Sequence, residues 1–358
     1  MKAIAFSGSF DDVNRHFEEK GWSDGLPIVP PTWDKIEQFL QVVGRAGDEE
    51  VAVLPPANLR ASLQSIAANG IMAGCRPQHM PLLVAAVEAI ADTRFNLAQI
   101  GTTAGYNPFL IINGPAIGKL GLEYGTGLIS RGANVAIGRA LGLIVRNIAG
   151  YRPAEQQMGT FGYLLPFVLA EDEEGSPWEP FHVERGFDKA ASTVTAGGTF
   201  NWGSQIFPSG PEPEGLLRAI AYQMVKDVNL MLSARFSRLQ MMTVVINPSV
   251  AQTIAQGGYS KQDAADYLFH HARASMEDVV FESKYADPGG GGTSTRQLIE
   301  RGRGTPREWI DLGRPNDTVP VMAYPGAIHI VVCGDRTRNK AMTLYGVYST
   351  PSIKEMRM

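Results

Sequence analysis

The chain has 358 residues, of which 44% are hydrophobic and 19% charged, so a large folded core is expected rather than disorder. Its 32 basic and 36 acidic residues give a net charge of -4 with no long block of like charge, which argues against nucleic acid as a partner. Two cysteines are too few for a disulfide framework or a cysteine-rich zinc site.

Apolar runs are short. The longest, 136–149, is interrupted by Arg139 and Arg146, and no run reaches the roughly 18 residues that a membrane span needs. The N-terminus turns polar at Ser7, too early for the apolar segment of a signal peptide. We therefore expect a soluble cytoplasmic protein with no membrane partner.

The N-terminal region, 1–57, is predicted to be an arm followed by a helix. Residues 11–20 have helical spacing, and 34–43 form a second helix with Thr32 as its cap. Between them, the glycines and prolines of 25–32 prevent regular hydrogen bonding, so this stretch is expected to be extended and fixed on the surface.

Residues 58–210 form the first predicted α/β half. Apolar residues recur there at helical spacing, and continuous apolar runs mark buried strands. A glycine-rich loop, 121–132, precedes the last helix. The expected elements are helices 61–73, 81–91 and 133–148 and strands 109–112, 164–169 and 192–195.

Residues 211–358 form the second predicted half, with helices 215–233 and 261–274, strands 242–246 and 328–333, and a segment 340–348. The glycine run in 287–294 is either a mobile surface loop or a lid over a site.

The two halves share a short sequence match. Ile112-Asn113-Gly114-Pro115 resembles Ile246-Asn247-Pro248, and each follows a strand and precedes a helix. The match is short enough to arise by chance. If it reflects descent, the chain is an α/β protein of two packed halves related as a diverged internal repeat, with a cleft between them.

Cys75 is the first candidate for chemistry. It precedes a predicted helix and is followed by Arg76, two features that favour the thiolate and lower a cysteine pKa. Such a thiol acts as a nucleophile or redox group. The alternative is a small buried side chain at a helix junction.

A polar cluster follows the strand predicted at 164–169. The four consecutive acids of 171–174 would repel one another unless cations, a metal or raised pKa values neutralise them. His182 and Arg185 add a proton carrier and an anion-binding group, and the rigid residues around Trp178 would hold the segment against the protein. The alternative is an acidic turn in water.

The sequence also permits two ligand sites, one for a metal and one for an anion. His182 and Glu184 alternate as ligands on a strand would, which permits a divalent metal. The loop 121–132 could hold an anion on backbone amides with help from Arg131, although it lacks a nucleotide-binding motif. Cofactors stay open between none and a divalent metal.

The chain also resembles a family of uncharacterised bacterial proteins. The resemblance rests on 23–32, 72–77, 112–115, 173–180 and 260–263 and covers 21–274. Those proteins look similar to the partner or fused segment of proteins in which selenocysteine or cysteine precedes Gly-Ser-Cys, the UGSC motif. That motif is absent here, so its redox chemistry does not carry over. The resemblance implies only that Cys75 and 173–185 belong to recurring motifs.

The favoured function is an enzyme acting on a small polar or carboxylate substrate in a cleft between the halves. In this hypothesis Cys75 is the nucleophile or redox thiol, and His182 with Glu173 or Glu174 moves protons. The alternatives are a metal-dependent lyase or hydrolase using His182 and Glu184, and a non-catalytic subunit of a redox complex that binds a partner protein through 25–32. A homo-oligomer is also open. The expected substrate-binding residues are Arg76, Asn113, Arg131, Ser176 and Arg185.

Overall fold

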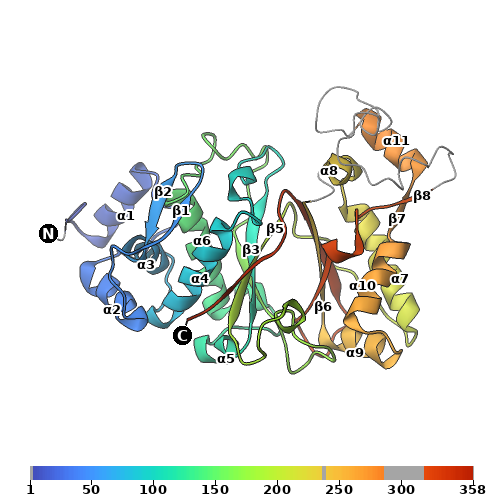
Figure 1. Cartoon of the computed structure of the whole chain (residues 1–358). Coiled ribbons are helices and arrows are strands. Elements are labelled where there is room, and N and C mark those ends of the chain that lie inside the picture. Colours follow the sequence, from blue (N-terminus) through green and yellow to red (C-terminus); the bar gives the residue numbers. More distant parts are fainter. Residues whose placement is uncertain (1–2, 236–238, 286–317, 358) are drawn as a thin grey trace. The chain divides into compact units, whose positions relative to one another are not determined.

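The computed structural model describes residues 3–235, 239–285 and 318–357, and the chain divides into two compact units (Figure 1). The first unit consists of 1–170, 185–197 and 351–358, and the second of 171–184 and 198–350. Both units mix helices and sheet, which confirms the predicted α/β class. The boundary differs from the one expected at 210/211, because the acidic segment 171–184 packs with later residues and the C-terminus packs with the first unit.

The first unit contains a four-stranded sheet with the order β11-β5-β3-β4. Strands β3 and β4 are parallel and place Phe109 opposite Phe167, whose rings stack with centroids 5.3 Å apart. Every residue of β3 is buried, as expected of a strand covered on both faces. The strands are β3 (Asn107–Asn113), β4 (Phe167–Ala170), β5 (Thr193–Thr199) and β11 (Ser352–Glu355).

The helices α3, α4 and α6 pack with one another, and α4 and α6 also contact this sheet. Helix α4 is apolar around most of its circumference, and almost all its residues are buried. Helix α6 approaches the chain before β4 so closely that a Cβ on Gly138 would lie 2.3 Å from the Pro166 carbonyl oxygen. The helices of this unit beyond the arm are α2 (Trp33–Val43), α3 (Leu63–Met72), α4 (Met80–Ala91), α5 (Ala116–Leu120) and α6 (Gly132–Asn147).

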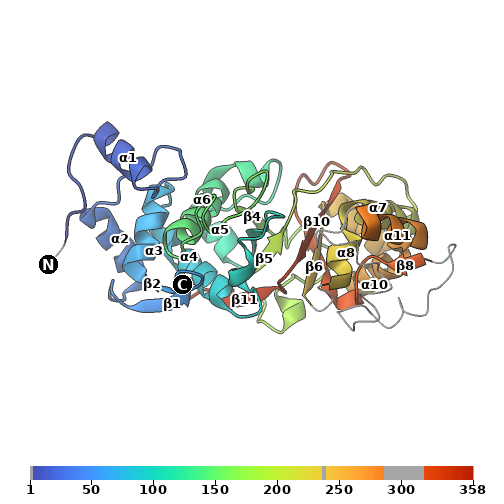
Figure 2. The same ribbon diagram turned by 90° about the horizontal axis from the view of Figure 1, so that it is seen from above.

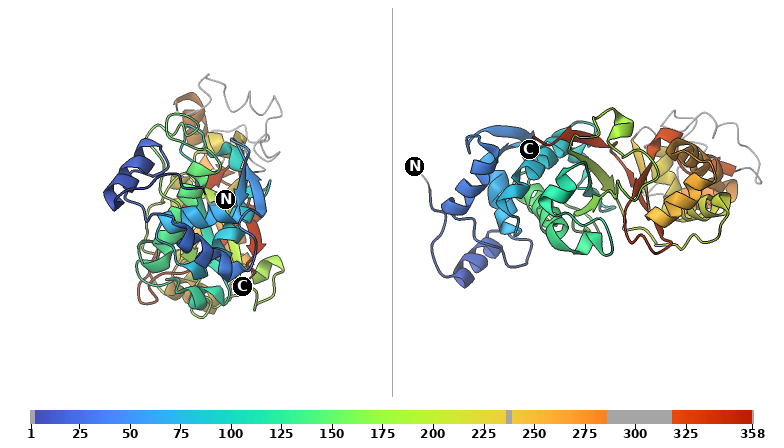
Figure 3. Two further views of the ribbon diagram at one scale, coloured as in Figure 1. Left: turned by 90° about the vertical axis from the view of Figure 1, so that its left-hand side faces the viewer. Right: turned by 90° about the horizontal axis from the view of Figure 1, so that it is seen from below.

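The N-terminal arm begins with helix α1 (Phe10–Glu19), whose first turn is capped reciprocally by Ser9 and Asp12. None of its residues is buried, and it lies apart from α2 in two views (Figure 2, Figure 3). Thr32 is the N-cap residue of α2 as predicted, but its side chain makes no capping hydrogen bond.

A hairpin that the periodicity does not predict precedes α3. Strands β1 (Glu50–Leu54) and β2 (Leu59–Ser62) pair antiparallel, so the first residues of the helix predicted at 61–73 belong to a strand. Ser62 sets the boundary because its Oγ accepts the Ser65 N–H as the N-cap of α3.

The second unit is built on a sheet with the order β10-β6-β9, in which β6 and β9 are parallel and β10 is antiparallel to β6. All three strands are buried throughout. Helix α7 packs against both α9 and α10, and α7 and α10 contact this sheet (Figure 1). These elements are α7 (Pro213–Asp227), β6 (Gln240–Ile246), α9 (Pro248–Gln256), α10 (Lys261–His271), β9 (Ile328–Val332) and β10 (Ala341–Val347).

Two predicted helices are shorter than expected. The helix predicted at 215–233 is interrupted at Val228, whose backbone is extended, and the one predicted at 261–274 ends at His271. The remaining elements are α8 (Leu230–Arg235), β7 (Arg273–Ser275), α11 (Met276–Tyr285) and β8 (Thr318–Pro320), with short 3-10 turns η1 (Pro77–His79), η2 (Leu97–Gln99), η3 (Leu128–Ser130), η4 (Val183–Arg185) and η5 (Pro325–Ala327).

Three further predictions concern the glycine run, the internal repeat and membrane spans. The loop 287–294 lies outside the described residues. Asn113 ends the buried strand β3 and Asn247 follows the buried strand β6, and each precedes a helix, but α5 has five residues and α9 has nine. The internal repeat therefore stays a prediction. Within the described ranges, every helix is too short or too polar to cross a membrane.

Candidate functional site

The acidic segment 171–174 follows β4 in the chain and belongs to the second unit, where its first two carboxylates are buried. Glu171 is 1% and Asp172 2% exposed. The Asp172 N–H donates to the Val332 carbonyl oxygen at the end of β9. Because β6 and β9 are parallel, this is the edge of the sheet where α/β proteins commonly build ligand sites.

Lys261 neutralises the first of these acids. It is the first residue of α10 and only 6% exposed, and its Nζ lies 3.4 Å from Glu171 Oε1 and 3.2 Å from Glu184 Oε2. Its ammonium also donates to the Glu179 carbonyl oxygen at 3.1 Å. A single buried cation thus connects three points of the segment 171–184.

Arg336, in the loop after β9, neutralises the second acid. Its Nε and Nη2 donate to the two oxygens of Asp172 at 2.7 and 2.5 Å, the paired geometry that gives guanidinium–carboxylate contacts their strength. Asp172 also accepts the Gly175 N–H. Glu174, whose side chain is 89% exposed, lies 3.8 Å from Arg336. Glu171 and Asp172 are therefore neutralised by cations. Of the four acids, only Glu174 fits the alternative of an acidic turn in water.

Aromatic residues hold the segment as predicted. Trp178 Nε1 donates to the Tyr259 carbonyl oxygen at 3.0 Å, and Phe181 is fully buried with its ring 5.9 Å from that of His329. Ser176, expected to bind substrate, instead exchanges hydrogen bonds with the backbone of Trp178 and shapes the turn.

The third acid faces a histidine. His182 is fully buried, and its Nδ1 lies 3.8 Å from Glu173 Oε1. Neither ring nitrogen of His182 has a hydrogen-bond partner in the part of the chain that the structure describes. The Glu173 side chain keeps 21% of its surface exposed. This pair therefore combines a carboxylate that reaches solvent with a shielded imidazole behind it.

The structure lacks the strand on which His182 and Glu184 were expected to bind a metal. His182 and Glu184 were expected to alternate on a strand, but 183–185 form the turn η4, and Glu184 is paired with Lys261. No group of three or more metal-ligating side chains occurs within 3–235, 239–285 and 318–357.

The prediction of a low pKa for Cys75 is wrong. Burial raises the pKa of the thiol to about 12, since the side chain is only 9% exposed. The turn η1 (Pro77–His79) separates Cys75 from the first residue of α4, Met80, so the thiol does not lie in the first turn of that helix. Cys333, after β9, is 2% exposed, and burial together with the charges of Glu171 and Asp172 raises its pKa well above the usual value.

Iodoacetamide should label Cys75 in the native protein roughly a hundredfold more slowly than in urea-unfolded protein, because the thiolate is the reacting species. Peptide mapping by mass spectrometry separates this label from one on Cys333, which serves as the buried control. Equal labelling rates of Cys75 in native and unfolded protein would support the prediction of a reactive thiol.

The other predicted residues belong to the first unit, whereas the acids belong to the second. Arg76 is exposed, Arg131 lies 3.6 Å from Glu123, and Asn113 is fully buried at the end of β3. Arg185 ends η4. Cys75 and the segment 171–184 belong to different units, so a joint site between them stays a prediction.

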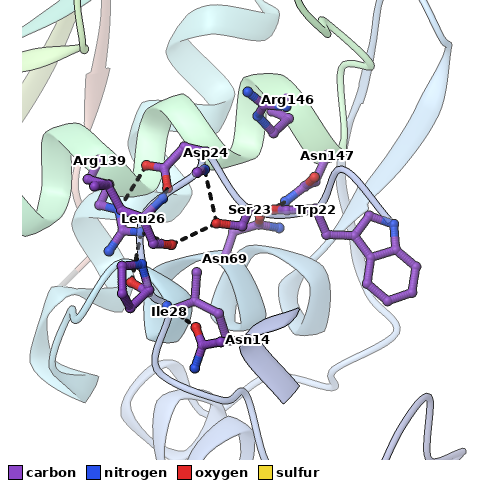
Figure 4. A network of polar contacts seen from close by, with 12 residues as sticks. Asn14, Trp22, Ser23, Asp24, Leu26, Ile28, Asn69, Arg139, Arg146 and Asn147 are labelled. Atoms are coloured by element: carbon purple, nitrogen blue, oxygen red, sulfur yellow. Dashed lines mark hydrogen bonds and ion pairs between the residues drawn. The ribbon is translucent and has the colours of Figure 1, made fainter. Parts of the chain in front are cut away.

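A second polar network fixes the arm within the first unit (Figure 4). Arg139 of α6 donates to both oxygens of Asp24 at 2.8 and 2.9 Å and to the carbonyl oxygens of Leu26 and Pro27. Burial opposes ionisation of Asp24, but the hydrogen bonds and charge of Arg139 outweigh it, so the pKa of Asp24 lies below its usual value. The predicted surface position of this extended segment is confirmed, with Leu26 53% exposed.

Sequence reasoning missed Lys261 and Arg336. Arg336 had a usable signal, since it follows a buried strand by four residues, whereas nothing in Ser260-Lys261-Gln262 distinguishes a buried lysine from a surface one. A scan of family models, a search of curated proteins and a search of solved structures each find no match for this chain.

Proposed function

We propose that the chain is an enzyme that transfers a proton to or from a small anionic substrate at the Glu173–His182 pair. The observation that carries this proposal is His182, a fully buried imidazole with no hydrogen bond on either nitrogen within the described ranges. Buried polar groups in folded proteins are nearly always hydrogen-bonded, so an exception needs an explanation, and a catalytic role is one of the recognised explanations.

Glu173 and His182 differ in solvent exposure, and their proposed roles differ accordingly. Glu173 reaches solvent and can meet a substrate, whereas His182 has no exposed surface and acts behind it. Carboxylate and imidazole are both common general acids and bases. Their 3.8 Å separation suits an unliganded site, because catalytic hydrogen bonds often tighten only when substrate binds. Glu173 is thus the catalytic residue and His182 its positioning residue.

Arg336 supplies recognition of the substrate charge. Asp172 fixes one edge of its guanidinium, and 49% of the side chain stays exposed in the loop after β9. A guanidinium held in this way costs little further ordering when it binds a carboxylate. Arg336 takes the role that the sequence assigned to Arg76, Arg131 or Arg185. The Cys75 thiol is protonated at neutral pH and takes no part in this proton transfer, which needs no metal.

Proton transfer at carbon can be tested without knowing the natural substrate. Wild-type protein in deuterium oxide with a panel of 2-oxo, 2-hydroxy and dicarboxylic acids should replace a carbon-bound hydrogen of at least one acid by deuterium, which proton NMR detects. Glu173→Gln should slow this exchange about 100-fold or more, since general acid–base groups contribute 10²–10⁴-fold. His182→Gln should slow it and change its pH profile.

The matched control is Glu179→Gln, which alters an exposed carboxyl group of the same segment and should leave exchange within about twofold. Circular dichroism verifies that each variant is folded. Absence of exchange with every acid, or full activity of Glu173→Gln, contradicts the proposal.

A further inference from the structure

Helix α6 presents two arginines with opposite environments. Arg139 and Arg146 are seven residues apart, two turns, and so lie on nearly the same face of the helix (Figure 4). The Nε and Nη2 of Arg139 donate to the Asp24 carboxylate and to two backbone carbonyl oxygens. Arg139 therefore shows how this helix can pair a partly buried guanidinium with a carboxylate.

Arg146 is not satisfied in this way. Its guanidinium carries five N–H donors, and within the described residues it makes one hydrogen bond, from Nη1 to the Gly21 carbonyl oxygen at 3.5 Å. The side chain is partly buried. The neighbouring Asn147 amide donates to the Trp22 carbonyl oxygen and to Asn69 Oδ1, and Arg146 makes no hydrogen bond to either of these oxygens.

The charge of a second cation, Arg152, also acts on Arg146. Burial lowers the pKa of Arg146, the charge of Asp24 partly offsets this, and the charge of Arg152 lowers it further. The Arg152 side chain makes no hydrogen bond or ion pair to any described residue. The last turn of a helix favours a cation, which accounts for a positive charge at Arg146 but leaves its donors unused.

We propose that Arg146, assisted by the positive charge of Arg152, binds the oxyanion group of a ligand. A planar guanidinium pairs two parallel N–H donors with the oxygens of a carboxylate or phosphate, and partial burial strengthens such a pair. The second arginine adds attraction without a competing carboxylate, because both oxygens of Asp24 are bound by Arg139. This site belongs to the first unit and does not depend on the Glu173–His182 pair.

Thermal denaturation in increasing inorganic phosphate, and separately in succinate, tests the site. Wild-type protein should show saturable stabilisation by at least one anion beyond that in sodium chloride of equal ionic strength. The anion with the lower apparent Kd identifies phosphate or carboxylate as the preferred group. Arg146→Gln should raise that Kd about tenfold or more, Arg146→Lys should raise it less, and Arg152→Gln should also weaken binding.

The matched control is Arg60→Gln, which removes one guanidinium from the same unit, but one that is 66% exposed and already paired with Glu50. Its Kd should equal that of wild type. If Arg146→Gln fails to fold, the lysine and Arg152 variants still give the comparison. Stabilisation no greater than that by chloride, or unchanged Kd in the Arg146 and Arg152 variants, overturns the proposal.

Discussion

Replacing Lys261 with methionine should lower the free energy of unfolding of the second unit by about 3–5 kcal/mol. The ammonium is 6% exposed and contacts the side chains of Glu171 and Glu184. Methionine matches its length but leaves the fully desolvated Glu171 carboxylate without its cation. Breaking a buried pair from one side costs more than the pair contributes, because the remaining charge stays buried. Urea denaturation measures the change.

The double variant Lys261→Met with Glu171→Gln distinguishes the lost charge from lost packing. Removing the orphaned carboxylate should recover a large part of the stability, since neutral side chains tolerate burial better. Lys226→Met is the control in the same unit, where an ammonium 4.2 Å from the Tyr222 ring centroid contributes about 1 kcal/mol or less. A loss below about 1 kcal/mol for Lys261→Met would show that the carboxylate is not desolvated.

Asp24→Asn should destabilise the first unit by about 3 kcal/mol at pH 7, because it leaves Arg139 without a carboxylate. Both side chains are mostly buried, at 15% and 17% exposed. The arm 23–28 would lose its strongest tie to α6, so its amides should exchange with deuterium faster than those of β3. Urea denaturation and hydrogen exchange give the two measurements.

The same pair predicts a pH dependence. The folded pKa of Asp24 lies below the unfolded value of 3.8, so its contribution is fully present above that value and is lost as pH falls through the folded pKa. Wild-type stability should therefore fall below about pH 4 more steeply than that of Asp24→Asn. Asp48→Asn, an exposed carboxyl change, should retain the wild-type slope. Parallel curves for wild type and Asp24→Asn contradict this assignment.

Local chemistry was sufficient to predict most elements. The buried strands 109–112 and 242–246 and the helix 133–148 correspond to β3, β6 and α6, because long apolar periodicity and continuous apolar runs need no distant partner to be interpreted. The hairpin β1–β2 was missed because its strands are short: β1 contains the apolar run 51–54, but four residues do not distinguish a strand from a loop, and β2 has no such run.

The site was predicted only in part. The acidic segment and His182 were chosen because four adjacent acids require neutralisation, and that requirement follows from charge alone. Which cations provide it depends on Lys261 and Arg336, which are 90 and 164 residues from the acids they bind. No local rule connects positions so distant in the chain.

The sequence by itself determined the α/β class, the main helices and strands, the fixed arm and the need to neutralise the acids, since all of these follow from backbone propensity, hydrophobic periodicity and like-charge repulsion. Tertiary structure alone decided which side chains lose water. Burial raised the pKa of Cys75 that its neighbours in sequence were expected to lower, and it left His182 and Arg146 short of hydrogen bonds. Desolvation depends on what the fold packs around a group, and residues adjacent in sequence do not specify it.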